Sequence, residues 1–125
     1  MPIHIIDDET VITEVLTSVL GPYSDQILCF HSAEEYLQHM NSDTYIAPRL
    51  IITDVRMGKM DGFEMIKRVR ANGSRAKVIV MSGFHIHHEN TEQSFDSFLA
   101  KPFDIELLLS TVSQVLANPI HPFNS

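Results

Sequence analysis

The sequence predicts an α/β protein built on one doubly wound, parallel sheet. Five short apolar runs are bounded by polar or turn residues and separated by longer segments, which is the spacing of alternating strands and helices. Several runs, such as residues 78–81, are apolar at every position, as expected of parallel strands that helices cover on both faces. Five such units in one sheet make a doubly wound fold. The expected strands are residues 2–6, 26–30, 49–53, 77–81 and 97–100.

Two helices are expected between the first three strands. The first has apolar residues at helical spacing and stops at Gly21 and Pro22. These apolar residues are Val11, Val15, Leu16 and Val19. The second begins with Ser32 as N-cap and Glu35 three residues later, the form of a capping box, and runs to about Met40.

Two further helices have clear signals in the second half of the chain. One ends near residues 72–73, and its apolar side consists of Phe63, Ile66 and Val69. The last is capped by Asp104 and ended by Pro119. Its apolar side consists of Leu108, Val112, Val115 and Leu116.

The segment between the last two strands has the weakest signal. It lacks a convincing apolar stripe and contains His85, His87 and His88. We therefore expect residues 84–97 to form a short or irregular helix that is more mobile than the others. Histidines in a polar loop, with no Cys or acid at clear ligand spacing, are more often solvated than bound to a metal.

Length and composition fit one globular domain. The chain has 125 residues, 44% of them hydrophobic, and we expect one domain over residues 1–118 with a short tail over 119–125. The N-terminus lacks the basic start and apolar middle of a signal peptide, and no apolar run reaches the roughly 20 residues of a membrane span. A cytoplasmic protein without membrane contact is expected.

Charge and cysteine content narrow the range of partners. Nine Lys and Arg against 16 Asp and Glu give a net charge of −7, which would repel a phosphate backbone, so no nucleic-acid partner is expected. The single Cys29 cannot form an internal disulfide and is predicted to be a buried thiol in an apolar run.

Polar residues follow four of the five expected strands. Asp7 and Asp8 follow the first, Asp54 the third, Ser82 the fourth and Lys101 the fifth. Because the carboxyl ends of parallel strands share one edge of a doubly wound sheet, these residues should converge on one cleft. An aspartate pair between a strand and a helix can also be a simple helix cap, an alternative that applies to Asp8 and Glu9.

Crowded carboxylates repel one another unless they take up protons or bind a cation. The formal sum of three aspartates and Lys101 is −2, which one Mg²⁺ balances, and Mg²⁺ favours a few carboxylates together with water and phosphate oxygens. A nucleophile, a metal and cationic or hydroxyl donors are the parts that phosphoryl transfer requires. Asp54, Mg²⁺, Lys101 and Ser82 would supply them.

Four segments carry these residues and resemble the signature blocks of response-regulator receiver domains. They read IIDDE from residue 5, IITDVRM from residue 51 with MDG from residue 60, VMSG from residue 80, and FLAKPF from residue 98. Each block alone is weak, but four in the family's order are specific and cover nearly the whole chain. The resemblance implies a flavodoxin-like sheet with strand order 2-1-3-4-5.

The resemblance also implies roles at the phosphorylation site. Asp54 would be the phosphoacceptor and Asp7 and Asp8 the acidic metal-binding pair. The backbone carbonyl of Arg56 would complete the metal site, and Lys101 would pair with the phosphoryl group. The Lys101-Pro102 peptide bond is typically cis in this family.

A switch and an access path are implied in the same way. Ser82 would be the switch hydroxyl and Phe98 its coupled aromatic ring. Arg56, Gly83 and Phe84 would flank the phosphoryl site, and the large side chains of Arg56 and Phe84 would slow hydrolysis by obstructing water.

The chain departs from the family's pattern in two places. Gly58 stands where proline is usual in the loop after the phosphoacceptor, so that loop is expected to be more mobile. The distance from Ser82 to Lys101 is about one helical turn shorter than in most receivers, which puts the fourth helix in doubt.

The function implied is that of a stand-alone, chemotaxis-type receiver in a two-component system or phosphorelay. It would take a phosphoryl group from a histidine kinase or phosphotransfer protein and change its affinity for a downstream partner that the sequence does not identify. It would catalyse only its own phosphorylation and dephosphorylation.

Two alternatives remain from the sequence. One is a pseudo-receiver that keeps the fold and signals without phosphate, although Asp54 and Lys101 argue against it. The other is a phosphohydrolase of the haloacid-dehalogenase type, which usually has a second aspartate where this chain has Arg56.

Overall fold

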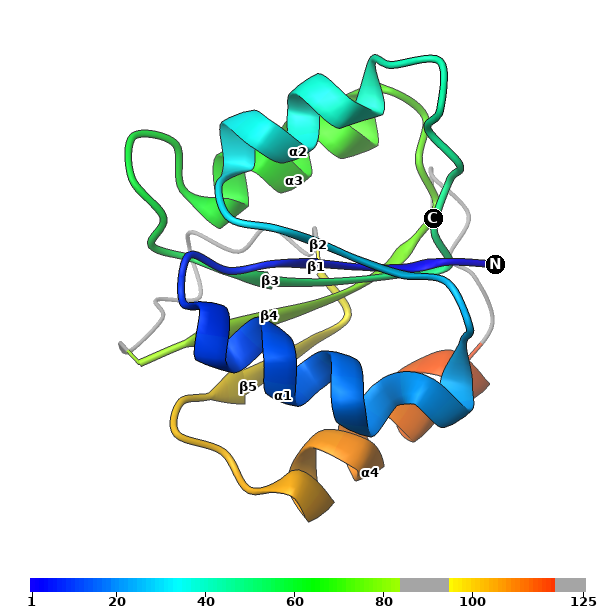
Figure 1. Cartoon of the computed structure of the whole chain (residues 1–125), viewed down its shortest axis with the longest axis vertical. Helices are drawn as coiled ribbons and strands as arrows, with labels where there is room; N and C mark the ends of the chain where they lie inside the picture. Colours follow the sequence, from blue (N-terminus) through cyan, green and yellow to red (C-terminus); the bar gives the residue numbers. More distant parts are fainter. Residues whose placement is uncertain (84–94, 119–125) are drawn as a thin grey trace.

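The computed structural model describes residues 1–83 and 95–118, which form a parallel sheet between two layers of helices (Figure 1). The five strands lie in the order β2-β1-β3-β4-β5, and every pairing is parallel. The strands are β1 Ile3–Ile6, β2 Ile27–Phe30, β3 Leu50–Asp54, β4 Lys77–Ser82 and β5 Ser97–Ala100. The predicted fold class and strand order are confirmed, and the predicted strand limits agree to within one residue.

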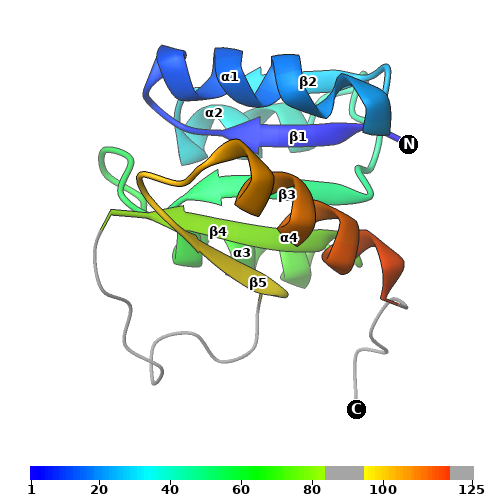
Figure 2. The ribbon, with the colours of Figure 1, turned by 90° about the horizontal axis from the view of Figure 1, so that it is seen from below.

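Helices cover both faces of the sheet (Figure 2). They are α1 Thr10–Leu20, α2 Ala33–Met40, α3 Gly62–Ala71 and α4 Ile105–Ala117, with a short 3-10 helix η1 at Gly21–Tyr23. Helices α1 and α4 lie on one face, while α2 and α3 lie on the other (Figure 1). This arrangement explains why the central strands β1, β3 and β4 are buried at every position.

The alternation of side chains along each strand divides the core into two clusters. In β3, Leu50 and Ile52 pack on the side of α1 and α4, whereas Ile51 packs on the side of α2 and α3. In β4, Ile79 and Val80 divide in the same way. Each strand is thereby fixed in register, because a shift of one residue would exchange its two faces.

Three helices begin at side-chain caps, two of which the sequence indicates. The Ser32 hydroxyl accepts a bond of 3.0 Å from the Glu35 N–H at the start of α2. The Asp104 carboxylate accepts one of 2.7 Å from Leu107 at the start of α4. Asp61 caps α3 in the same manner. The start of each of these helices is therefore set by a hydrogen bond between the cap residue and the residue three positions later.

The predicted apolar stripe of α1 is only partly the buried one. Val11 and Val15 are exposed, and the buried residues of α1 are Thr13, Leu16 and Leu20. The helix is turned so that Thr13 and the residues three and seven positions after it face the sheet. Thr13 can lie on this face because its hydroxyl donates to a backbone carbonyl within the helix, at 2.9 Å.

Several sequence predictions lie outside the described residues. These are most of the segment predicted at 84–97, the three histidines within it, and the tail at 119–125. Among the helices of residues 1–83 and 95–118, none is long and apolar enough to cross a bilayer.

Candidate phosphorylation site

The predicted site residues meet at one edge of the sheet. Asp7 directly follows β1, Asp54 and Ser82 are the last residues of β3 and β4, and Lys101 directly follows β5. Parallel strands with no register offset bring their carboxyl ends together, which is why residues from distant parts of the sequence become neighbours. The convergence expected from the strand pattern is present.

Three carboxylates form the centre of the site. Asp7, Asp8 and Asp54 each offer one carboxylate oxygen, and these oxygens all lie within 4.8 Å of one another. Asp7 and Asp54 are buried, whereas Asp8 is exposed. The group fits a hard divalent cation such as Mg²⁺, because its donors are oxygens and one side is open for water or phosphate ligands.

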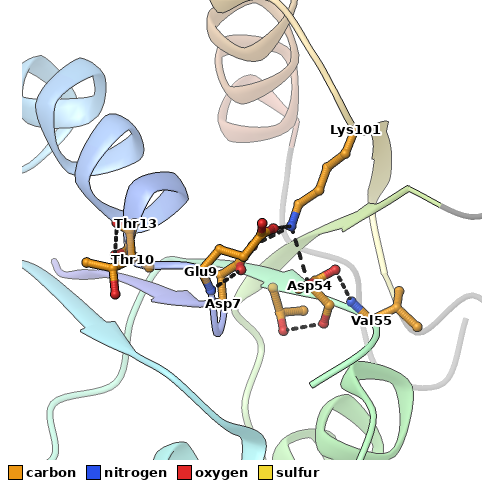
Figure 3. A network of polar contacts seen from close by, with 8 residues as sticks. Asp7, Glu9, Thr10, Thr13, Asp54, Val55 and Lys101 are labelled. Atoms are coloured by element: carbon orange, nitrogen blue, oxygen red, sulfur yellow. Dashed lines mark hydrogen bonds and ion pairs between the residues drawn. The ribbon is translucent and has the colours of Figure 1, made fainter. Parts of the chain in front are cut away.

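The side chain of Lys101 places a positive charge beside these carboxylates (Figure 3). Its ammonium nitrogen Nζ lies 2.7 Å from Asp7 Oδ2 and 3.3 Å from Asp54 Oδ2. The Lys101-Pro102 peptide bond is cis, as the family resemblance implied. The lysine therefore ties the buried carboxylate after β1 to the one at the end of β3.

Burial dominates the electrostatics of the two buried aspartates. It raises the pKa of Asp54 above its ordinary value, even though the Lys101 charge and the Val55 N–H favour the ionised form. Burial likewise raises the pKa of Asp7 against the hydrogen bond from Lys101. Burial acts to lower the pKa of Lys101, but its bond to Asp7 and the nearby carboxylates outweigh burial and raise that pKa.

Backbone and side-chain bonds fix the direction of the buried carboxylates. Asp7 Oδ1 accepts from the Glu9 N–H at 2.8 Å, while its other oxygen receives Lys101. Asp54 Oδ1 accepts from the Val55 N–H at 2.8 Å (Figure 3). Both oxygens of Asp7 are thus engaged by protein donors, which suits a carboxylate that acts on a metal through water.

The loop after Asp54 is held against the site from two sides. The Gly62 N–H donates to the Val55 carbonyl at 2.7 Å, and Glu34 of α2 accepts from the Met60 N–H at 3.1 Å. Within this loop Gly58 has a φ of 73°. A proline cannot adopt this angle, because its ring fixes φ near −65°. The departure from the family's proline therefore matches the backbone conformation; the predicted mobility of this loop stays a prediction.

The two predicted switch residues lie on neighbouring strands and one sheet face. Ser82 is buried at the end of β4, and Phe98 of β5 is paired with Val80, two residues before Ser82. Because paired residues of parallel strands point to the same face, Phe98 and Ser82 share a face. Phe98 is exposed, so its ring is outside the core in this state.

The predicted access residues are placed in part. Arg56 and Gly83 are exposed beside the ends of β3 and β4, and Phe84 lies outside the described residues. Two contacts of the site were not expected from the sequence: Glu34 on the loop, and Glu9, whose Oε1 lies 3.2 Å from Lys101 Nζ. Glu9 extends the acidic run at residues 7–8, which is a visible signal, but from the sequence alone Glu9 reads as a possible helix cap. No sequence signal indicated Glu34.

The family model and the curated relatives indicate the same protein family. The family model described as response regulator receiver domain matches residues 3–113. The transcriptional regulatory protein FixJ of Azorhizobium caulinodans is 30% identical over 115 residues, which cover 90% of this chain and 53% of FixJ. The curated relatives are longer proteins, and the chain spans from a quarter to little more than half of those compared.

Solved structures share the fold over nearly the whole chain. The N-terminal domain of the Wolinella succinogenes protein WS1339 has a TM-score of 0.79 and 28% identity, with 94% of each chain covered. The chemotaxis response regulator CheY4 of Vibrio cholerae has a TM-score of 0.80 and 23% identity, covering 91% of this chain and 97% of that chain. At that identity, the likeness to CheY4 shows the fold alone.

Proposed function

The chain belongs to the response-regulator receiver family of two-component signalling, and from this premise we propose that Asp54 is its phosphoacceptor. The donor would be a phosphohistidine on a histidine kinase or phosphotransfer protein. The observation that carries the proposal is the position of the Asp54 carboxylate, which ends β3 next to two further aspartates and 3.3 Å from Lys101. The family assignment also speaks against the haloacid-dehalogenase alternative.

The proposed reaction exchanges one bond at phosphorus for another. An Asp54 carboxylate oxygen attacks the phosphorus atom, the new oxygen–phosphorus bond forms, and the phosphorus–nitrogen bond to the donor imidazole breaks. The imidazole nitrogen leaves with the electron pair and takes a proton from solvent. Asp54 Oδ1 is held by the Val55 N–H, so the carboxylate is oriented before the donor arrives.

Asp8, Asp54 and the Arg56 carbonyl are proposed to hold Mg²⁺, with Asp7 acting through water. The bound ion would neutralise charge on the phosphoryl oxygens. The engagement of both Asp7 oxygens by Glu9 and Lys101 supports an indirect role for that residue.

Lys101 and Ser82 are proposed to bind the oxygens of the transferred group. The ammonium group of Lys101 already lies beside Asp54, so it can pair with a phosphoryl oxygen without a large movement. Movement of the Ser82 hydroxyl toward the phosphoryl group would open space into which the Phe98 ring can turn. The exposed position of Phe98 is consistent with the unphosphorylated state.

The output is proposed to be a change in affinity for a protein partner. Phosphorylation can shift the population of two conformations only if the phosphoryl group interacts differently with each, and Ser82 supplies such a differential contact.

The test is phosphorylation by a small phosphodonor with Mg²⁺, followed by intact-mass measurement. The wild type should gain the mass of one phosphoryl group, and Asp54→Asn should gain none. Asp43→Asn changes an exposed aspartate between α2 and β3, outside the three-carboxylate group, and should behave as wild type. A wild-type chain that stays unmodified under donor and Mg²⁺ would instead favour the pseudo-receiver reading. A gain in mass by Asp54→Asn would place the phosphoacceptor elsewhere.

A further inference from the structure

Lys101 has a carboxylate partner besides the aspartates of the site. Glu9 Oε1 lies 3.2 Å from Lys101 Nζ, and the contact is visible at the centre of Figure 3. Its side chain is 64% exposed, compared with 0% for Asp7 and 11% for Asp54. Glu9 therefore reaches the ammonium group from the solvent side, whereas the two aspartates reach it from within the protein.

The position of Glu9 in the fold does not account for this contact. Glu9 is the N-cap of α1, the position at which a Ser, Thr, Asp or Asn side chain ordinarily accepts a hydrogen bond from the first turn of the helix. Its side chain makes no such cap bond. The backbone N–H of Glu9 holds Asp7, and the side chain is directed to Lys101. The carboxylate is thus committed to the site and not to the helix.

The ammonium group of Lys101 is fully engaged by these neighbours. It has three N–H donors, and three carboxylates lie at 2.7, 3.2 and 3.3 Å from its nitrogen. An arriving phosphoryl oxygen can bind Lys101 only when one of these contacts weakens. Asp7 is fixed by burial and a second hydrogen bond, and Asp54 is the nucleophile. Glu9 is the partner that can move into water at least cost.

We propose that Glu9 is a positioning residue that holds the Lys101 ammonium group before phosphorylation and competes with the incoming phosphoryl group for it. The inference rests on the proposed function of Asp54 and Lys101. Glu9 also adds a negative charge on the side from which an anionic phosphodonor approaches. Both effects slow the reaction of Asp54, so Glu9 sets how readily the site accepts a phosphoryl group.

The variant Glu9→Gln tests this by removing the charge while keeping the length of the side chain. At saturating Mg²⁺ and with a small phosphodonor, its phosphorylation rate should exceed that of the wild type by about three- to tenfold, the size expected for one screened charge several ångströms away. Glu9→Asp keeps the charge but shortens the reach to Lys101, so its rate should fall between the two. Glu14→Gln removes an exposed charge of α1 outside the site and should leave the rate unchanged.

A second readout separates competition for Lys101 from a structural role. Added salt screens an exposed charge, so the difference in rate between the wild type and Glu9→Gln should shrink as ionic strength rises. Thermal unfolding of Glu9→Gln should be close to that of the wild type, because no cap bond is lost and the ion pair with Lys101 involves an exposed carboxylate, whose contribution to stability is small. A wild type that is phosphorylated at Asp54 while Glu9→Gln reacts equally fast or more slowly would overturn the inference and leave the proposed function standing. A wild type that is not phosphorylated would overturn both.

Discussion

Gly62 lies directly against the backbone carbonyl of Asp54. A Cβ atom added at Gly62 would collide with that carbonyl oxygen and lie 3.2 Å from the Val55 Cα. The Gly62 N–H also donates to the Val55 carbonyl, so the first residue of α3 is fastened to the end of the strand that carries the phosphoacceptor. The glycine is required here by close approach of two backbone segments.

Gly62→Ala should destabilise the protein and displace the end of β3. We expect the free energy of unfolding to fall by about 1 to 3 kcal/mol, the usual cost of an atom forced into a packed site. Phosphorylation of Asp54 should slow as well. Gly21→Ala is the matched control, because a Cβ at Gly21 meets no atom within 4 Å. Chemical denaturation measures both variants, and equal stability of the two would contradict the packing argument.

Asp8→Ala should weaken Mg²⁺ binding by about tenfold or more, since loss of even an outer-shell partner of a metal site costs 10- to 100-fold. Asp8 is the exposed member of the three-carboxylate group, so its replacement should disturb the packing of the site least. Isothermal titration with Mg²⁺ is the measurement, and Asp43→Ala serves as the control for loss of an exposed aspartate. Undiminished affinity in Asp8→Ala would exclude Asp8 as a ligand.

Asp54→Asn should make the metal-free protein more stable at neutral pH. Burial raises the pKa of Asp54, so the folded state bears an ionised carboxylate that water would solvate better. Removing this charge should raise the free energy of unfolding by about 0.5 to 2 kcal/mol, the usual gain when a substitution removes a destabilising feature of a functional site.

The advantage of Asp54→Asn should depend on pH in a defined direction. A carboxyl group whose pKa is raised on folding takes up its proton first in the folded state as pH falls. The wild type therefore recovers its deficit below the raised pKa of Asp54, and the two proteins should converge near the ordinary aspartate pKa of about 4. A gap that widens on acidification would reverse this assignment.

His4 lies in an aromatic cluster on the face of the sheet that α2 and α3 cover. It is fully buried, as the sequence predicts for an interior histidine, and its Nδ1 lies 2.9 Å from the Tyr36 hydroxyl. Its Nε2 finds no hydrogen-bond partner among the described residues. The rings of Phe30, His39 and Tyr45 also contact it. Burial, and to a lesser degree the charge of His39, lowers the pKa of His4 from 6.5 to about 4.

Protonation of His4 should contribute to acid unfolding. Because the unfolded chain binds a proton near pH 6.5 and the folded chain only near pH 4, the stability that neutral His4 provides is complete above pH 6.5 and decreases below it. The total loss by pH 4 is about 3 kcal/mol. The free energy of unfolding of His4→Leu should fall less steeply between these values. A fall as steep in His4→Leu as in the wild type would contradict this assignment.

Arg56→Asn should shorten the lifetime of the phosphorylated protein severalfold. Arg56 is exposed beside the phosphoacceptor strand, where a large side chain can obstruct the water that attacks the phosphorus atom in line with the leaving oxygen. The measurement is the decay of phosphorylated protein at fixed Mg²⁺, with Lys59→Asn in the same loop as control. Slower decay in Arg56→Asn than in the wild type would mean that the guanidinium speeds hydrolysis as a transition-state cation.

The sequence by itself determined the strands, the capped helices and the set of residues at the carboxyl edge of the sheet. The Ser32 and Asp104 caps depend on hydrogen bonds that span three residues, and strand limits depend on local runs of apolar side chains. The strand pattern alone predicts that Asp7, Asp54 and Lys101 lie together, because the topology of a parallel sheet fixes which strand ends meet.

Only the tertiary structure decided how these elements face one another. The rotation of α1, which exposes Val11 and buries Thr13, follows from its packing on the sheet and α4, since both sides of that helix offer apolar residues. The contact of Glu9 with Lys101 joins segments far apart in the sequence, and the close approach of Gly62 to Asp54 depends on how the loop between β3 and α3 folds back on the strand. Such contacts depend on the relative placement of whole elements to within an ångström, and local periodicity carries no information at that scale.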